Sequence, residues 1–176
     1  MIDLFGSETK TMLKDAEVSP CGLYRYSLTR IWDKAQPLVS WIMLNPSTAD
    51  ASVDDPTIRR VIGFTRSWGY GGFVVRNLFP LRATDPKELD SHQYPFGPAE
   101  NRMVSGELLD ALMNYPLIVC AWGSKVPFRR DWEFMEVAAA NGKTLHCLRL
   151  SKGGMPCHPL YMPADLQPIL FREGKV

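Results

Sequence analysis

The sequence predicts an α/β protein in which helices cover both faces of a mostly parallel sheet. Two observations carry this prediction. Apolar runs typical of buried strands occur at 38–44, 73–78, 116–123 and 144–150, and segments with helical signals separate them. Such alternation is typical of a parallel sheet with helices on both faces. We therefore expect a three-layer α/β/α sandwich with four central strands and an N-terminal antiparallel edge strand.

The remaining elements follow from local signals. Residues 8–16 suggest a short helix, and the aromatic and β-branched run 23–32 predicts the antiparallel edge strand. Helices are expected to begin at Pro56 and Pro86, because each proline follows an aspartate suited to cap a helix. Two further helices are predicted over 99–113 and 130–141.

Length and composition bound the class of protein. The 176 residues, 45% of them hydrophobic, suit one domain over 1–176, and the net charge of +1 gives no global attraction for nucleic acid. No apolar run approaches the ~18 residues of a membrane span, and the N-terminus lacks the pattern of a secretory signal. We expect a cytoplasmic monomer without membrane contact.

The sequence predicts neither a metal nor a cofactor. Its four cysteines form no C-x-x-C pair. The pairs His146-Cys147 and Cys157-His158 offer four ligand atoms, but adjacent residues of a strand point to opposite faces, which disfavours one shared metal site. No glycine-rich phosphate loop follows a strand, so a nucleotide cofactor of the common kinds is not indicated.

Polar residues follow three of the predicted central strands. Asn45 comes directly after the first, and Pro46 ends that strand because proline cannot donate a ladder hydrogen bond. Asn77 closes the second strand, and His158 follows the fourth. Right-handed crossovers place these strand ends at one edge of the sheet. Asn45, Asn77 and His158 are therefore expected to converge on one site.

Four segments in sequence order resemble motifs of the uracil-DNA glycosylase superfamily. They are Asn45-Pro46-Ser47, the stretch from Asn77 to Arg82, the strand LIVCAWGSK and His158-Pro159. The resemblance covers about Leu38 to Pro163. Met43 stands where the superfamily's first motif has glycine, and Leu160 stands where serine usually follows His-Pro. The block LNPSTAD…DDPTIRR is also similar to a small bacterial and phage family of unknown function.

The resemblance implies hydrolysis of an N-glycosidic bond in DNA, releasing a deaminated or modified base. Asn45 then orients the attacking water, and His158 hydrogen-bonds the departing base. An amide is no general base, so Asp50 is expected to supply a carboxylate, with Asp54 and Asp55 as alternatives. Helix capping before Pro56 explains the same acidic run without catalysis.

The resemblance also implies residues that bind the base and the DNA backbone. Asn77 matches the hydrogen-bonding edge of an extruded base, with Ser47 and Tyr161 as further base-binding candidates. Phosphate contacts are expected from Arg82, Lys125, Arg129 and Lys152. Candidates for an aromatic floor are Phe64, Trp68, Tyr70, Trp122 and Tyr161. Two alternatives stay open: a relative that binds a nucleotide or modified nucleic acid without cleaving it, and an unrelated α/β enzyme.

Overall fold

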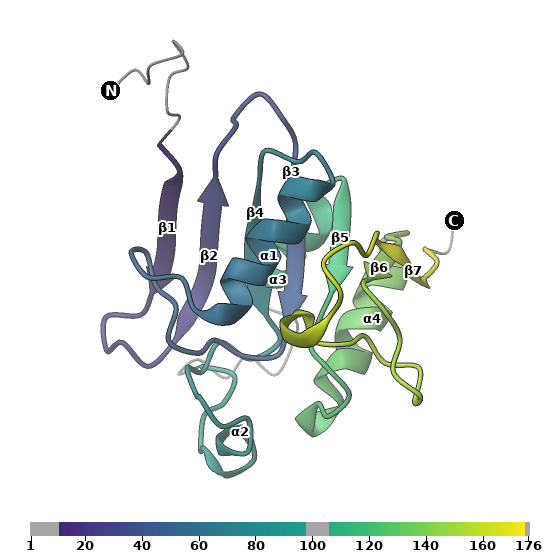
Figure 1. The fold of residues 1–176 in the computed structure, drawn as a ribbon. Coiled ribbons are helices and arrows are strands. Elements are labelled where there is room, and N and C mark those ends of the chain that lie inside the picture. Colours follow the sequence, from purple (N-terminus) through teal and green to yellow (C-terminus); the bar gives the residue numbers. More distant parts are fainter. Residues whose placement is uncertain (1–10, 98–105, 175–176) are drawn as a thin grey trace.

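A computed structural model describes residues 11–97 and 106–174 (Figure 1). Within these ranges, seven strands form one mixed sheet in the order β1-β2-β4-β3-β5-β6-β7. The strands are β1 (Leu13–Val18), β2 (Arg25–Ile31), β3 (Leu38–Met43), β4 (Gly72–Asn77), β5 (Leu117–Cys120), β6 (Leu145–Cys147) and β7 (Ile169–Arg172). The four strands β4, β3, β5 and β6 are mutually parallel, as the apolar runs predict, while β1, β2 and β7 pair antiparallel.

Helices lie on both faces of the sheet (Figure 1). The α-helices are α1 (Pro56–Ser67), α2 (Glu88–Ser91), α3 (Gly106–Met113) and α4 (Arg130–Ala140), with short 3-10 turns η1 (Pro127–Arg129) and η2 (Pro159–Tyr161). Helix α1 packs its buried side chains on one face of β3 and β4, whereas α3 and α4 pack on the opposite face. The structure thus confirms a mixed α/β protein.

The core of the α1 face shows how sequence pattern becomes packing. Trp41 on β3 is fully buried, stacks on Trp68 with ring centroids 5.5 Å apart, and donates its indole N–H to Thr65 Oγ1 at 3.1 Å. Phe64 completes this aromatic group. The indole nitrogen therefore has the partner that a buried donor requires.

Several expectations at the ends of the chain were wrong. Residues 13–16 belong to strand β1, so the described part of the predicted helix 8–16 is not helical. The run at 23–32 therefore forms the second strand, not the edge strand. A C-terminal strand, β7, was not predicted. Its half-exposed apolar residues lie on an edge, where the alternation of a buried strand is weak.

The predicted helix starts are confirmed at Pro56 but not at Pro86. Helix α1 begins at Pro56 with Asp55 as its cap, as predicted, because Asp55 Oδ1 accepts from the Ile58 N–H at 2.8 Å. Asp85, in contrast, caps only a turn, and α2 starts at Glu88. Part of the helix predicted over 99–113 lies outside the described residues, and its described part is helical, as α3, through Met113. No helix in the described ranges is long and apolar enough to cross a membrane.

Gly72 lets β4 approach both of its neighbours closely. A Cβ atom there would lie 2.4 Å from the Arg30 carbonyl oxygen, which belongs to backbone that cannot easily move. We expect Gly72→Ala to lower the free energy of unfolding by about 1–3 kcal/mol. The control is Gly63→Ala on α1, where nothing lies within 4 Å, and which should stabilise the helix by about 0.5–1 kcal/mol. Urea unfolding of both variants checks this, and equal effects would contradict it.

Candidate functional site

Two buried arginines of β2 hold the loop that follows β3. The guanidinium of Arg25 donates to the Ala49 carbonyl at 2.7 Å, and that of Arg30 donates to the Asp50 carbonyl at 2.6 Å. Arg30 also pairs with Asp54 at 2.7 Å. Both arginines are nearly inaccessible, with 3% and 0% of their surface exposed. The polar loop predicted from Asn45-Pro46-Ser47 is therefore fixed by charge-assisted hydrogen bonds to the sheet.

A β-bulge in β2 accounts for the direction of Arg25. Glu17 pairs with Ser27 and Val18 with Arg25, so Tyr26 has no partner in this register. Tyr26 packs on the α3/α4 side and Leu28 on the α1 side, although residues two apart in a regular strand share a face. Bulges re-aim side chains in this way, and Arg25 points to the α1 side, where Asn77 lies.

Asn77 is buried at the end of β4 with only half of its amide satisfied. Its Oδ1 accepts from Arg25 Nη2 at 3.4 Å, while its Nδ2 has no hydrogen-bond partner. Because an arginine only donates, it fixes the amide with the oxygen towards the guanidinium. The Nδ2 donor of Asn77 is thus buried and, among the described residues, left without a partner.

His158 caps the short turn η2 and is held as a neutral donor. Its Nδ1 accepts from the Leu160 N–H at 3.4 Å, which leaves the proton of a neutral ring on Nε2. Burial lowers the pKa of His158 below its ordinary value, and the nearby negative charge of Asp55 partly offsets this. At neutral pH the ring is uncharged and can donate from Nε2.

Asp55 links the two halves of the site electrostatically. Its carboxylate lies close enough to Arg25 and to His158 to affect the pKa of both groups. Its Oδ1 caps α1 by accepting from the Ile58 N–H. Burial lowers the pKa of Arg25 to about 10, so the guanidinium stays charged at neutral pH. Asp55 was one of the two alternatives to Asp50 as the carboxylate of the site. It acts on both Arg25 and His158, and so it lies more centrally than Asp50 does.

Asn45 and Asp50 have well-defined local partners. The Nδ2 of Asn45 donates to the carbonyls of Ala83 at 2.8 Å and Pro46 at 3.1 Å, so its Oδ1 is the group left to accept a hydrogen bond. Asp50 Oδ1 accepts from Ser52 N, Ser52 Oγ and Val53 N. These hydrogen bonds lower the pKa of Asp50 to about 2. Asp50 is thus ionised at neutral pH and a poor proton acceptor.

The structure brings most of the predicted polar residues to the same region, but not into one pocket. Asn77 pairs in register with Met43, and the Phe79 N–H donates to the Leu44 carbonyl, which places Asn45 and Asn77 on neighbouring chain segments. Asp55 connects His158 to this region. A pocket of about 300 Å³ nearby is lined by Ser47 and Arg82, and not by Asn45, Asn77 or His158.

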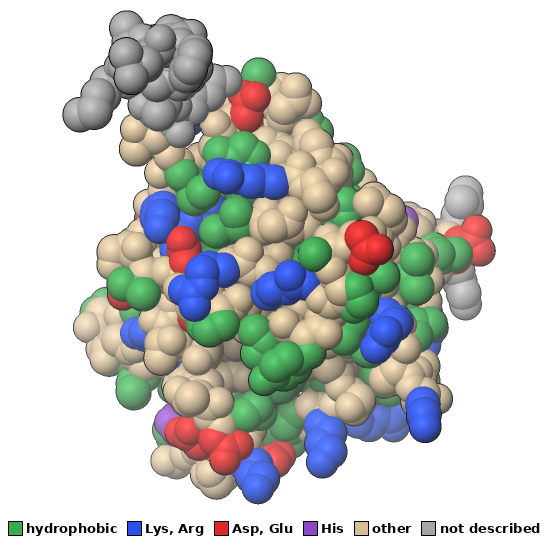
Figure 2. All heavy atoms as spheres, in the orientation of Figure 1, with side chains coloured by type: hydrophobic (Ala, Val, Ile, Leu, Met, Phe, Trp, Pro, Cys, Tyr) green, Lys and Arg blue, Asp and Glu red, His purple; other side chains and the backbone are tan. Residues whose placement is uncertain are grey.

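The other predicted contact residues lie on the surface. Tyr161 is 86% exposed, while Lys125, Arg129 and Lys152 are exposed on the loops after β5 and β6. Arg129 stacks on Trp132, with its guanidinium carbon 5.2 Å from the ring centroid. Figure 2 shows several Lys and Arg side chains along the lower edge, the side on which the parallel strands end in Figure 1.

Three of the five aromatic candidates lie in the core, as the helical spacing of Phe64 and Trp68 predicts for those two. Phe64 and Trp68 pack with Trp41, and Trp122 is buried against Phe134 and Phe171, so these rings belong to the core. Three phenylalanines instead cluster just after β4, with centroids 5.2–6.4 Å apart: Phe79, Phe96 and Phe128. Phe128 is about half exposed at this edge.

Arg25 is the main site residue that sequence reasoning missed. The available signal was the pair of arginines at 25 and 30 inside a run otherwise typical of a buried strand. Charged residues are rarely fully buried unless they bind something. Such a pair therefore indicates a structural anchor or a ligand site.

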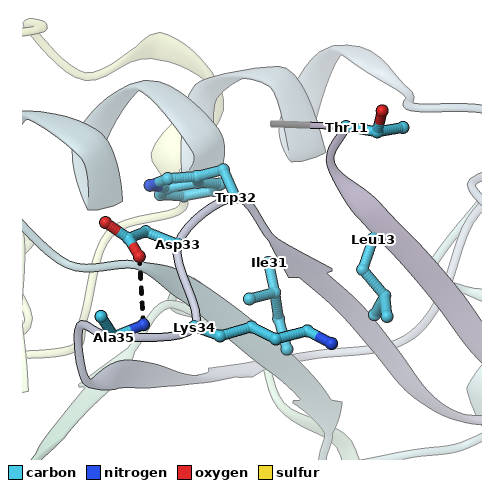
Figure 3. A pocket seen from close by; sticks show the side chains of 7 residues that line it. All are labelled: Thr11, Leu13, Ile31, Trp32, Asp33, Lys34 and Ala35. Carbon is cyan, nitrogen blue, oxygen red and sulfur yellow. Dashed lines mark hydrogen bonds between the residues drawn. The ribbon is translucent and has the colours of Figure 1, made fainter. Parts of the chain in front are cut away.

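A second pocket lies at the opposite edge of the sheet. Thr11, Leu13 and residues 31–35 line a hollow of about 430 Å³ (Figure 3). Residues 31–35 connect the end of β2 to the start of β3, so this hollow lies at the amino ends of the parallel strands, away from Asn45. Among the described residues, no group of three or more His, Cys, Asp or Glu side chains is arranged to hold a metal ion.

Fold and site together define a mixed α/β protein with a polar site at the carboxyl ends of its parallel strands. A family model described as "Protein of unknown function (DUF1643)" matches residues 25–160, and the chain belongs to this family. No curated protein matches the chain, and no solved structure matches it either. The family description names no activity, so function is argued from the site.

The lowered pKa of His158 predicts a pH dependence of stability. The unfolded chain binds a proton at His158 more readily than the folded chain, so this contribution is complete above pH ~6.5 and is lost as the pH falls towards the lower folded-state value. We expect His158→Asn, whose Oδ1 can still accept from Leu160, to reduce the loss of unfolding free energy between neutral and mildly acidic pH. His146, whose pKa burial also lowers, contributes separately, and His146→Gln measures that part. An unchanged dependence in His158→Asn would contradict the assignment.

Proposed function

We propose that this protein is a DNA glycosylase-like hydrolase that removes a deaminated or modified base, built on a three-layer α/β/α sandwich. The observation that carries the proposal is the pair of donors at the strand ends. Asn77 offers an N–H fixed by Arg25, and His158 offers an N–H from a neutral ring. Donors held in place before a reaction stabilise negative charge where it develops.

The chemistry follows from these positions. The bond between C1′ and the base nitrogen breaks, and its electron pair leaves with the base, whose negative charge is stabilised by the N–H groups of His158 and Asn77. A water molecule that donates a hydrogen bond to Asn45 Oδ1 adds to C1′. The proton that this water releases reaches the base through solvent. The ionised carboxylate of Asp50 stabilises the positive charge on the sugar rather than accepting a proton.

DNA is the proposed partner, bound by a monomer in the cytoplasm. Arg82, Lys125, Arg129 and Lys152 supply the phosphate contacts, with Ser47 and Tyr161 close to the base. These residues follow the four parallel strands β3, β4, β5 and β6, which gives a continuous strand of DNA several points of contact. The small net charge of +1 makes the local arrangement of cations the deciding factor.

A second candidate function is binding of a nucleotide or modified nucleic acid without cleavage. The partners of Asn45 and Asp50 favour it. The amide N–H groups of Asn45 donate to the carbonyls of Ala83 and Pro46, and one carboxylate oxygen of Asp50 stabilises a turn. Neither contact is needed for recognition of a base by Asn77.

Incubation with oligonucleotides that contain uracil, hydroxymethyluracil, hypoxanthine or a thymine mismatch, followed by alkali, separates the two functions. We expect strand breaks at one of these bases. His158→Ala removes a donor to the departing base and should slow excision by about 100-fold. Asn45→Ala should also slow it, because the attacking water loses its acceptor. His92→Asn, an exposed histidine outside the site, is the control.

Intact strands with every base, together with measurable binding of one of them, would favour the second function.

Asp50→Asn distinguishes charge from turn formation at that residue. All three hydrogen bonds to the Asp50 side chain use Oδ1, which asparagine keeps. If the charge stabilises the sugar cation, Asp50→Asn lowers the excision rate while the unfolding free energy stays close to that of the parent protein. A full excision rate in this variant would assign Asp50 to the turn alone, and Asp55→Asn then tests the neighbouring carboxylate.

A further inference from the structure

The pocket between the loop after β3 and the segment after β4 is lined mainly by polar side chains. Its wall includes the hydroxyl-bearing residues Ser47, Thr48 and Thr84 together with Arg82. None of these three hydroxyls has a hydrogen-bond partner among the described residues, and the volume of about 300 Å³ exceeds what one water molecule fills. The lining is therefore free to bind a polar ligand.

Two arginines supply positive charge here without an ion pair. Arg82 donates from Nη1 to the Gly22 carbonyl, and its buried Nε has no partner. Arg25 lies behind the pocket wall: its guanidinium holds the carbonyl of Ala49, the residue after Thr48, and its buried Nε also lacks a partner. The two guanidinium groups are close enough to repel each other. In the described ranges neither arginine is within ion-pair distance of a carboxylate.

A buried charge without an ion pair is costly. Arg25 is such a charge, whereas Arg82 is partly exposed to solvent. A tetrahedral oxyanion satisfies the free hydroxyls and the arginine together, since its oxygens accept from several directions. Glu88 also lines the pocket, with one oxygen accepting from the Asp85 N–H. Its negative charge disfavours a dianion, so a singly charged phosphodiester fits better than a phosphate monoester.

We propose that the pocket formed by Ser47, Thr48, Arg82 and Thr84 binds one phosphodiester group, with Arg25 as a second, buried source of positive charge. This places one phosphate of the DNA backbone beside the strand-end donors, and it rests on the proposed function only in taking DNA as the source of that phosphate. The pocket is distinct from the exposed cations of the loops after β5 and β6, which carry no comparable cluster of hydroxyls.

Methylphosphonate scanning of a short single-stranded DNA tests this site. Each probe carries one neutral linkage in place of a charged one, and binding is measured by fluorescence anisotropy. We expect one linkage whose neutralisation weakens binding by about tenfold, as for loss of a charge-assisted hydrogen bond. In Arg82→Gln that same linkage should have no effect, and the slope of log K against log[salt] should fall by about one.

Further variants keep the test informative if Arg82→Gln folds poorly. Thr84 is exposed, and Thr84→Val removes its hydroxyl while keeping the shape of the side chain. This variant should therefore bind DNA several-fold more weakly and show a smaller effect of the same linkage. The control is Arg66→Gln on α1, an arginine stacked on Trp32, which should leave the linkage effect unchanged. An effect that persists in Arg82→Gln and Thr84→Val, or no sensitive linkage at all in DNA that binds, would overturn the proposal.

A separate arm identifies the source of the phosphate. If DNA does not bind, calorimetry compares a nucleoside, its 5′-monophosphate and a dinucleoside monophosphate. Binding that requires the phosphate and is lost in Arg82→Gln supports the pocket with a nucleotide as its ligand, and no phosphate dependence overturns it. Base excision is not needed in any of these measurements, so failure of the glycosylase activity is seen independently.

Discussion

The hydrogen bonds from two buried guanidinium groups of β2 to the loop after β3 are the constraint on which the site depends. Burying two cations in a protein of this size is costly, and the structure offsets the cost by directing their N–H groups at backbone carbonyls that would otherwise lack partners. Ala49 and Asp50 are fixed in this way, and Asp55 follows them into the first turn of α1. The loop is therefore a rigid part of the sheet edge rather than a flexible connection.

The two arginines differ in how their charge is balanced. Arg30 is paired with Asp54, which Lys14 contacts as well, so its charge is neutralised within the protein. Arg25 forms no ion pair among the described residues: its guanidinium donates to the Ala49 carbonyl and to the Asn77 amide oxygen, and the carboxylates of Asp55 and Asp50 act on it only from a greater distance. A residue that only anchors the loop needs no more than the contacts of Arg30: a hydrogen bond to a loop carbonyl and an ion pair. The unbalanced charge of Arg25 is the feature that a purely structural role leaves unexplained, and it lies next to the most buried amide of the site.

The presence of the parallel strands and the start of α1 could be predicted because local signals and tertiary packing agree there. The run 38–44 is apolar on both faces, and Asp55-Pro56 combines a cap with a first-turn proline. The strands at the edges of the sheet could not be predicted. Strands β1 and β7 are short and largely exposed, so their sequences lack the hydrophobic periodicity that marks a buried strand. Asn77 was predicted from its place at a strand end. Arg25 was not, because its direction depends on a bulge that only the pairing with β1 reveals.

The charges around Asn77 also bear on the kind of ligand that this edge accepts. A neutral His158, a charged Arg25 and the nearby carboxylate of Asp55 together leave little net charge. The unpartnered groups of Asn77 and Arg25 are N–H donors, and His158 can donate from Nε2. Such donors favour a ligand that brings oxygen atoms or acquires negative charge. A phosphodiester brings oxygen atoms, and a departing base acquires negative charge. In the parts of the chain that the structure describes, the Arg25 guanidinium donates only to the Ala49 carbonyl of the loop and the Asn77 amide oxygen. Its charge nevertheless favours both the base and the phosphodiester of a nucleic-acid ligand.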